Sequence, residues 1–416
     1  MNRRQFLSRA GAVAAATRLG LEPRSSAAAL HTGRAAIDEQ ARELFPWAEN
    51  ETFLNSAAYH PISIRSAEAM REYIGYRLEG PPAELDDVGA SGRGTGGAKQ
   101  VAIKEQFAEL IHAKPTEIAF AQSTADGEST VLAGMELGRS GGNVVIDELH
   151  YPGSIYMYKR LEQQGLEVRM IRARDGAVDI EDIEKAVDDD TKLVSLCFVA
   201  SSNGYRHELE SVCKITHAHG AYVYADVIQG AGSVPLDVRT TGLDFCSCSS
   251  YKFLMGSRGF GFLYVKESLQ DTVVKPTRFG HRQFRTFDVS DGTWEPEPGA
   301  YRYETGNVSN VGAACVYESL KFILDVGVDN IRAHVKPLTD RLQEELPAMG
   351  YPRRTPVGND SPTVAFGLKD AARTAEALAN ANIAVTVRRD SIRVSPSVFN
   401  GQKDIDKLLG VLSRVG

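Results

Sequence analysis

The chain has 416 residues, of which 43% are hydrophobic and 24% are charged, and its formal net charge at pH 7 is −7. This length and composition are typical of a globular protein with a large and a smaller domain, and the acidic balance argues against nucleic acid as a partner. The five cysteines have neither the spacing of a zinc site nor that of a disulfide framework, so we expect buried free thiols and no metal.

The first 30 residues differ in composition from the rest. Arg3-Arg4-Gln5-Phe6-Leu7 precedes a small apolar run from Ala10 to Ala16, and Ser26-Ala27-Ala28-Ala29 follows. This order resembles a twin-arginine export signal, which predicts a periplasmic protein with residues 1–30 as signal or disordered segment. The alternative is an untidy basic N-terminus on a cytoplasmic protein. Arg18 interrupts the short apolar run, so we expect no stable membrane span.

Residues 31–60 are predicted to form a helix and a short strand that pack on the C-terminal domain. A second helical pattern starts at Ser63, and a loop rich in Gly and Pro runs from Gly80 to Gly97. Gly92-x-Gly94-x-x-Gly97 matches the dinucleotide-binding fingerprint by letter, but no strand precedes it, as that fingerprint requires. We therefore interpret it as a flexible active-site loop, and a nicotinamide dehydrogenase is the weaker alternative.

A polar turn, Gln122 to Gly127, joins a predicted strand at 117–121 to a predicted helix at 128–137. A strand, a hydroxyl-rich turn and a helix N-terminus together favour phosphate, because the first amides and the dipole of a helix attract anions. Ordinary capping of the helix by Ser123 or Thr124 is the alternative.

The chain then alternates regularly. Strands are predicted at 143–147, 167–171, 193–200 and 221–225, with helices at 153–165, 180–187 and 207–219. Such repeated units predict a parallel sheet covered by helices on both faces, with ligands at the carboxyl ends of its strands. The residues at or just past these ends are Thr124, Tyr151, Asn203, Asp226 and Lys252.

Lys252 lies between two strand-like apolar runs, residues 243–248 and 260–265. Lysine is rarely buried unless it is paired or functional, and a desolvated lysine becomes a usable nucleophile. Asp226 ends the preceding apolar run, and Gln229 follows it. A carboxylate at one strand end and a lysine at the next is the arrangement that pyridoxal phosphate (PLP) chemistry requires. For an isolated lysine, a solvated loop would be the alternative.

Residues 275–305 are irregular and rich in arginine, proline and aromatic residues, which indicates a functional segment. From Val311 a long helix runs to about Val326, and helices then alternate with short strands to the C-terminus. We assign residues 61–305 to a large domain and residues 306–416 to a smaller one.

The order of these parts resembles the class V aminotransferase family of fold type I PLP enzymes, over roughly residues 50–412. That family includes cysteine desulfurases, C–S lyases and isopenicillin N epimerase-like proteins. The most specific motifs are residues 225–232 (ADVIQGAG) and Ser249-x-Tyr251-Lys252. The resemblance implies an α/β protein with the PLP-transferase fold: a large domain with a mostly parallel seven-stranded sheet, plus a smaller C-terminal α/β domain. It also implies a homodimer with its active site at the subunit interface.

The resemblance also implies roles for individual residues. Lys252 would form a Schiff base with PLP and then act as the base at the substrate Cα. Asp226 would hold the pyridinium nitrogen, and Arg393 would bind the substrate carboxylate. The remaining predicted cofactor contacts are Thr124, Ala125, Ser249, Tyr251 and Asn307 for the phosphate, Gln229 and Asn203 for the phenolic oxygen, and Tyr151 (with His150 as fallback) for ring stacking. Asn55 and His281 are assigned to the substrate pocket.

Three positions depart from the family pattern. Ala125 stands at a phosphate-binding threonine, Tyr251 replaces the histidine before the lysine, and Asn307 replaces a threonine that reaches the neighbouring subunit's phosphate. Each substitute keeps a polar group or a backbone donor, so we still expect PLP to bind.

No cysteine occurs between Ala384 and Arg393, where a desulfurase would carry its nucleophile on a mobile loop. We therefore predict an enzyme other than a persulfide-forming cysteine desulfurase. It would act on an amino acid or amino-acid conjugate through Cα deprotonation, by β-elimination at a C–S bond or by epimerisation. Transamination is the alternative, and a non-catalytic binding protein of the same fold is a remote one.

Overall fold

The computed structural model describes residues 37–80, 97–139 and 141–415. The twin-arginine prediction and all but the last residue of the Gly92–Gly97 motif lie outside these ranges. Within them, no helix combines the length and hydropathy that crossing a lipid bilayer requires.

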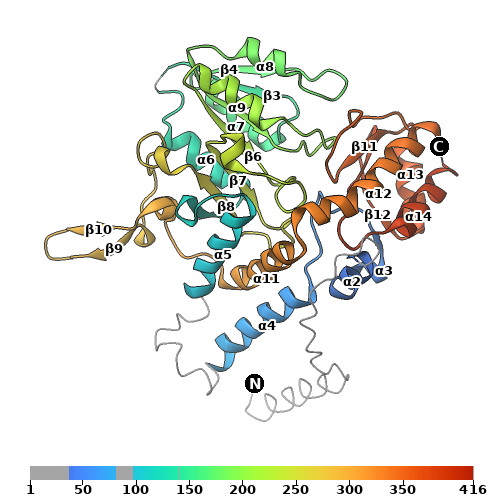
Figure 1. The fold of residues 1–416 in the computed structure, drawn as a ribbon, viewed down its shortest axis with the longest axis horizontal. Coiled ribbons are helices and arrows are strands. Elements are labelled where there is room, and N and C mark those ends of the chain that lie inside the picture. Colours follow the sequence, from blue (N-terminus) through green and yellow to red (C-terminus); the bar gives the residue numbers. More distant parts are fainter. Residues whose placement is uncertain (1–36, 81–96, 140, 416) are drawn as a thin grey trace, which may run out of the picture. The chain divides into compact units, whose positions relative to one another are not determined.

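A seven-stranded sheet lies within residues 118–265 (Figure 1). Its strand order is β2-β8-β7-β6-β5-β3-β4, and all neighbours are parallel except β8, which is antiparallel to both β2 and β7. The strands are β2 Ile118–Ala121, β3 Asn143–Asp147, β4 Glu167–Ile171, β5 Thr191–Cys197, β6 Tyr222–Asp226, β7 Phe245–Ser249 and β8 Gly261–Val265. The predicted, mostly parallel fold type I sheet is confirmed.

Helices cover this sheet because its central strands are apolar and buried along their whole length, as parallel strands require. The covering helices are α6 Thr124–Gly134, α7 Pro152–Glu162, α8 Ile180–Ala186, α9 Leu209–Ala218 and the short α10 Val238–Thr241. Val144, Ile146 and Leu193 of the sheet share one core with Val131 of α6 and Tyr158 of α7. The five cysteines are free and buried.

A second core lies among the C-terminal elements, which are orange and red in Figure 1. The antiparallel strands β11 Val364–Gly367, β14 Ser391–Val394 and β13 Thr386–Val387 pack with α12 Val328–Ala348, α13 Ala371–Asn380 and α14 Gln402–Leu412. Leu338, Phe366, Ile392 and Leu408 are fully or almost fully buried in this core.

The N-terminal segment packs on these C-terminal elements. It contains α2 Ile37–Leu44, α3 Trp47–Asn50 and β1 Thr52–Phe53, and β1 pairs in parallel with β12 Ile383–Ala384. Leu54 joins the second core, and Arg42 donates to Asp404 over 2.5 Å. Farther along the chain, α4 Ile64–Glu79 and α5 Gly97–Leu110 both pack against α11 Asn310–Val326.

Helix α6 begins at Thr124, four residues before the predicted start. The Ser123 hydroxyl caps it by accepting from the Asp126 amide over 3.1 Å. The predicted polar turn is therefore the first turn of the helix, because a serine cap satisfies an amide that would otherwise lack a partner. Thr124 and Ala125 lie at the very N-terminus.

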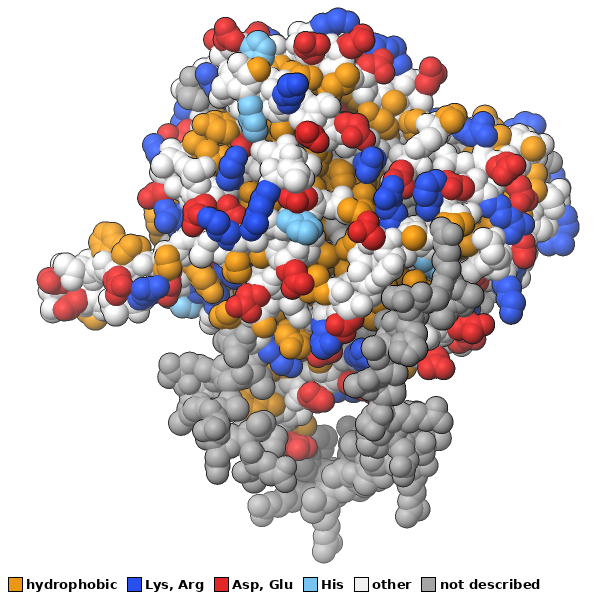
Figure 2. Space-filling view, viewed as in Figure 1, with side chains coloured by type: hydrophobic (Ala, Val, Ile, Leu, Met, Phe, Trp, Pro, Cys, Tyr) orange, Lys and Arg blue, Asp and Glu red, His pale blue; other side chains and the backbone are white. Residues whose placement is uncertain are grey.

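The segment 275–305, predicted to be irregular, contains a β-hairpin that projects from the domain in Figure 1. Its antiparallel strands are β9 Phe284–Phe287 and β10 Trp294–Pro296, flanked by 3-10 turns at His281–Gln283 and Gly299–Tyr303. Figure 2 shows hydrophobic side chains exposed on this hairpin, with Val289 at 90% and Trp294 at 65% exposure. The strands were missed because both of their faces are exposed, so no buried-polar alternation marks them.

Gly204 lets the C-terminal elements approach the loop after β5. Its φ is +78°, and a Cβ there would lie 1.9 Å from the Thr363 carbonyl oxygen. We expect Gly204→Ala to lower the free energy of unfolding by about 3 kcal/mol or more, since backbone strain and overpacking add together. Gly165→Ala is the matched control, because its φ is +104° with nothing within 4 Å, and it carries only strain of about 1–2 kcal/mol. Urea unfolding of both variants measures the difference, and equal losses would contradict the steric argument.

Candidate active site

Lys252 follows β7 at the carboxyl edge of the sheet and is only 6% exposed. Burial lowers the pKa of its amine to about 8, with Asp226 opposing this shift and Arg393 adding to it. The Lys252 Nζ lies 6.0 Å from the centre of the Tyr151 ring and 5.8 Å from that of Tyr251. In the described part of the chain it forms neither a hydrogen bond nor an ion pair. A fraction of this amine is therefore unprotonated at neutral pH and available to react.

Asp226 ends β6, the strand beside β7, and is 3% exposed. Its Oδ1 accepts from the Ile228 amide over 2.9 Å. Burial raises the pKa of this carboxyl to about 6, although His150 and Lys252 both favour the charged form. Burial costs this carboxylate more than its one backbone hydrogen bond and the nearby charges return, so a cation bound next to it would stabilise its charged form.

The N-terminus of α6 meets the end of β7 through two hydroxyls. The Thr124 amide donates to the Ser249 Oγ over 3.0 Å, and the Ser249 amide donates to the Thr124 Oγ1 over 3.0 Å. The Ala125 amide forms no hydrogen bond within the described residues, and its residue is exposed. Two hydroxyls and a free amide at a helix N-terminus form a cradle suited to an anion such as phosphate.

Gln229 and Asn203 differ in how open their side chains are. Gln229 donates its Nε2 to the Ala57 carbonyl over 3.0 Å, and its buried Oε1 has no partner among the described residues. The Asn203 Nδ2 donates to the Gly176 carbonyl over 2.7 Å, and its Oδ1 accepts from the Tyr205 amide over 3.1 Å. Gln229 thus keeps a free acceptor, whereas Asn203 holds backbone segments together, and its contact with the phenolic oxygen stays a prediction.

Arg393 lies on β14 with 6% exposure. Its Nη1 donates to the Ser201 carbonyl over 2.6 Å, its Nη2 donates to the Thr386 hydroxyl over 3.1 Å, and its buried Nε has no partner among the described residues. The Thr386 hydroxyl in turn donates to the Asn55 Oδ1 over 2.7 Å. A buried guanidinium held only by neutral groups is an anion site, and Asn55 belongs to its support.

Residues 55–60 link this anion site to the lysine. Asn55 contacts Thr386, Ala57 accepts from Gln229, and the His60 amide donates to the Tyr251 carbonyl over 2.9 Å. One short stretch therefore touches both the Arg393 side and the Lys252 side of the site.

His281 and Asn307 lie next to each other. Both are exposed, and the His281 Nε2 lies 3.3 Å from the Asn307 Oδ1. Within the described part of the chain, neither forms a hydrogen bond with the residues around Lys252. Their predicted roles in substrate and phosphate binding stay predictions.

A buried network beside Asp226 was missed from the sequence. The His150 Nε2 lies 3.0 Å from the Ser195 Oγ and 3.5 Å from the Glu128 Oε1, and Glu128 also accepts from Ser154 over 2.6 Å. Burial opposes the charge on His150, but the carboxylates of Glu128, Asp147 and Asp226, with Glu128 contributing most, outweigh it and raise the pKa of the ring. The available signal was Glu128 itself, a charge at helical spacing from the buried Val131 and Leu132.

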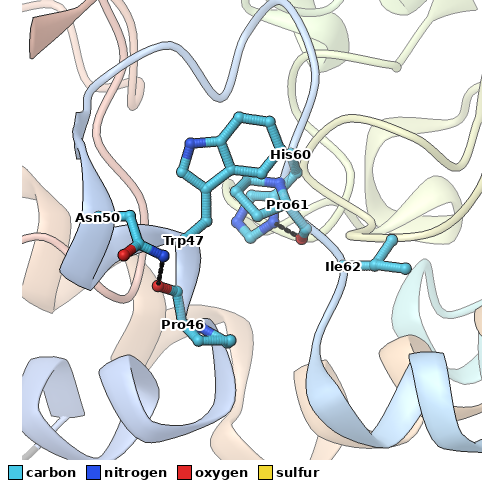
Figure 3. A pocket seen from close by; sticks show the side chains of 6 residues that line it. All are labelled: Pro46, Trp47, Asn50, His60, Pro61 and Ile62. Atoms are coloured by element: carbon cyan, nitrogen blue, oxygen red, sulfur yellow. Dashed lines mark hydrogen bonds between the residues drawn. The ribbon is translucent and has the colours of Figure 1, made fainter. Parts of the chain in front are cut away.

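The hollow in Figure 3 is a different feature. It is lined by Pro46, Trp47, Asn50, His60, Pro61 and Ile62 and has a volume of about 540 Å³. Burial lowers the pKa of His60 to about 4, so the ring is neutral at pH 7. The hollow offers neither a lysine nor an anion cradle, and it is not the cofactor site.

A sheet with a buried lysine, an adjacent carboxylate and an anion cradle at its carboxyl edge defines a fold type I PLP protein. The family model for class-V aminotransferases matches residues 94–408, and the chain belongs to that family. It is 25% identical over 375 residues to an uncharacterized aminotransferase, YcbU, of Bacillus subtilis, covering 89% of this chain and 95% of that protein. It is 26% identical over 406 residues to a probable cysteine desulfurase of Pyrococcus abyssi, covering 91% of this chain and 98% of that protein. The apo structure of a cysteine desulfurase from Thermococcus onnurineus NA1 superposes with a TM-score of 0.79 at 24% identity, covering 91% of this chain and 97% of that one.

These comparisons correct one prediction. We predicted an enzyme other than a persulfide-forming cysteine desulfurase because residues 384–393 contain no cysteine. That exclusion is wrong as it stands, since a relative named as a probable cysteine desulfurase aligns along nearly its whole length, including the fold that carries the site. The composition of one ten-residue stretch cannot decide where a sulfur acceptor lies in a folded chain.

The cofactor is PLP, and the site fits it. The unpartnered Lys252 amine can carry its aldehyde carbon, and the buried Asp226 carboxylate suits a protonated ring nitrogen. The free Gln229 Oε1 and the anion cradle at Thr124, Ala125 and Ser249 suit its polar substituents. Among the described residues, the Lys252 amine, the Gln229 Oε1 and the Ala125 amide each lack a hydrogen-bond partner, which PLP would supply.

Proposed function

We propose that this enzyme cleaves the C–S bond of a cysteine-like amino acid after removing the proton from its Cα. The single observation that carries the proposal is the buried, unpartnered Lys252 amine, whose pKa responds to the charges of both Asp226 and the anion-binding Arg393. The names of relatives such as the Pyrococcus abyssi protein support sulfur-containing amino acids as the substrate class.

Arg393, Lys252 and Asp226 would each have a separate role in this reaction. Bound PLP supplies an electron sink for negative charge that develops at the substrate Cα. Arg393 binds the substrate carboxylate and so fixes which bond at Cα faces the lysine. Lys252, with a pKa of about 8, is suited to take the Cα proton and return it near neutral pH. Asp226 keeps a negative charge at the far end of the site, where it stabilises a protonated ring nitrogen.

Product analysis tests the proposal. The PLP-loaded protein is incubated with L-cysteine and L-cystine, and the products are separated. Pyruvate with ammonia and a released sulfur species indicates β-elimination, whereas alanine with sulfur passed to an acceptor indicates desulfuration; both break the C–S bond and support the proposal. A D-enantiomer alone indicates epimerisation, and a 2-oxo acid that needs an amino acceptor indicates transamination; either result alone would overturn it. Lys252→Ala is the control for background reaction.

Transamination is the second candidate. The Bacillus subtilis relative is named an aminotransferase, and it covers most of both chains. The same lysine and arginine would serve that reaction, because both reactions begin by removing the Cα proton.

We also propose that the enzyme works as a homodimer. The support is that Phe279 is 81% exposed, close in sequence to the exposed pair His281 and Asn307. These side chains contact few groups within one protomer and are therefore available to contact a second one. Light scattering of the purified protein gives its mass in solution, and a monomer that retains full activity would contradict this proposal.

A further inference from the structure

A second arginine, Arg388, lies on the same face of the C-terminal sheet as Arg393. In the β13–β14 ladder Thr386 is paired with Arg393, and the Arg388 amide donates to the Ser391 carbonyl over 2.7 Å. Side chains alternate along a strand, so Thr386 and Arg388 point to the face that carries Arg393. Diagonal neighbours in such a ladder are roughly 7–8 Å apart, which is within reach of two arginine side chains.

No acidic side chain in the described part of the chain forms an ion pair with the arginines on this face. Arg393 has only the Ser201 carbonyl and the Thr386 hydroxyl as partners, and its Nε has none among the described residues. Burial lowers the pKa of Arg393 to about 10, and the charge of Arg388 adds to this shift.

No carboxylate among the described residues forms an ion pair with Arg388. Asp390, the nearest acid in sequence, pairs with Arg354 over 2.8 Å. Arg388 itself is exposed, and across the described ranges its guanidinium forms no ion pair. The α-carboxylate of a substrate would balance one of the two arginines and leave the other without a counter-charge.

We propose that Arg388 binds a second anionic group, so that the preferred substrates are amino acids whose side chain ends in a carboxylate or a similar acid. This inference rests on the proposed function, because it requires Arg393 to hold the α-carboxylate. A solvated arginine that never meets the substrate is the competing explanation, and the two make different predictions.

A matched pair of substrates tests the inference. S-carboxymethyl-L-cysteine and S-carbamoylmethyl-L-cysteine have nearly the same shape and differ by one negative charge. β-Elimination breaks the Cα–H and Cβ–S bonds of either one, releases the thiol, and leaves pyruvate and ammonia after addition of water. We expect kcat/KM to be about tenfold higher for the carboxymethyl substrate, a ratio typical of one charge-assisted contact.

Variants show which residue causes the difference in kcat/KM between the two substrates. Arg388→Ala should bring the ratio close to one, and Arg388→Lys should retain part of it. Arg389→Ala is the matched control, since this neighbouring exposed arginine lies in the turn beyond the β13–β14 ladder, and it should keep the wild-type ratio. A wild-type ratio near one, a ratio that survives Arg388→Ala, or an equal loss in Arg389→Ala would overturn the inference while leaving C–S cleavage in place.

Calorimetry separates this inference from the proposed function. If neither cysteine derivative yields product, there is no kcat/KM ratio to compare, and titration of the PLP-loaded protein with succinate and with butyrate decides whether the second anion site exists. Succinate binding about tenfold more tightly than butyrate, with the difference lost in Arg388→Ala, supports the second anion site. Equal binding of the two acids overturns it.

Discussion

Replacing Lys252 with alanine is expected to lower kcat by about 10³–10⁴-fold on any amino acid that the enzyme accepts, because the variant loses both the amine that carries PLP and the base that takes the Cα proton. Steady-state assays with saturating PLP measure the effect. The fold should survive, because the removed amine has no partner in the described part of the chain and its loss leaves no protein group unpaired. A variant that keeps more than a tenth of the wild-type kcat would contradict the assignment.

Chemical labelling gives this prediction an internal control. Lys104 is the other buried lysine whose pKa is lowered by burial to about 8. It differs from Lys252 in forming an ion pair with Glu304 over 2.6 Å, which occupies the Lys104 amine. Borohydride reduction followed by peptide mass spectrometry should therefore find the cofactor on Lys252 and not on Lys104. Label on Lys104 would show that a lowered pKa, and not the free amine at the sheet edge, selects the site.

Asp226→Asn is expected to lower kcat by roughly 10²–10³-fold, the usual loss when a preorganised charge is removed from a site. The same substitution should stabilise the cofactor-free protein. The carboxyl has a pKa of about 6 when folded and an ordinary value of 3.8. The folded state therefore binds its proton more tightly, and wild-type stability falls as pH rises from about 4 to 6. Asparagine does not ionise, so the variant should gain about 3 kcal/mol over wild type at pH 8 and less than about 1 kcal/mol near pH 4.

Urea unfolding of the cofactor-free proteins at several pH values measures this gap, and saturating PLP should narrow it. Asp147→Asn is the control of opposite sign. Asp147 ends β3 at the same sheet edge, where burial opposes its charge but His207, 3.2 Å away, lowers the pKa below the ordinary value. Its replacement should destabilise the protein at neutral pH. If the difference in the free energy of unfolding between Asp226→Asn and wild type does not change with pH, burial does not destabilise the charged carboxylate.

The repeated strand and helix pattern between residues 117 and 265 was sufficient to predict the central sheet, because parallel strands are apolar along their whole length and their connecting helices are short and regular. Lys252 and Asp226 were predictable for a related reason, since each places a charge directly beside an apolar run. The β9–β10 hairpin was not predictable, because its exposed strands lack the alternation that one-sided burial imposes.

Contacts between residues that are far apart in the chain also could not be predicted from the sequence. Thr386 supports Arg393 and contacts Asn55 across more than 300 residues of chain, and nothing in its local pattern marks that role. The Asn203 side chain, whose predicted contact with the cofactor stays a prediction, donates to the Gly176 and Arg354 carbonyls, and nothing in its local pattern marks these partners. Such pairings depend on how the two cores dock, which periodicity along one segment cannot report.

The contacts of residues 55–60 determine where the chain can be truncated and how this stretch can change in sequence. Because it contacts Thr386, Gln229 and Tyr251, this stretch fixes the Arg393 side of the site relative to the Lys252 side. A truncation that removes the preceding β1 strand would release this stretch from β12 and so disturb both sides together, although the deleted residues touch neither. Shortened forms of the protein made for expression should therefore begin ahead of Thr52, and natural variation in this stretch should be accompanied by changes at both of its ends.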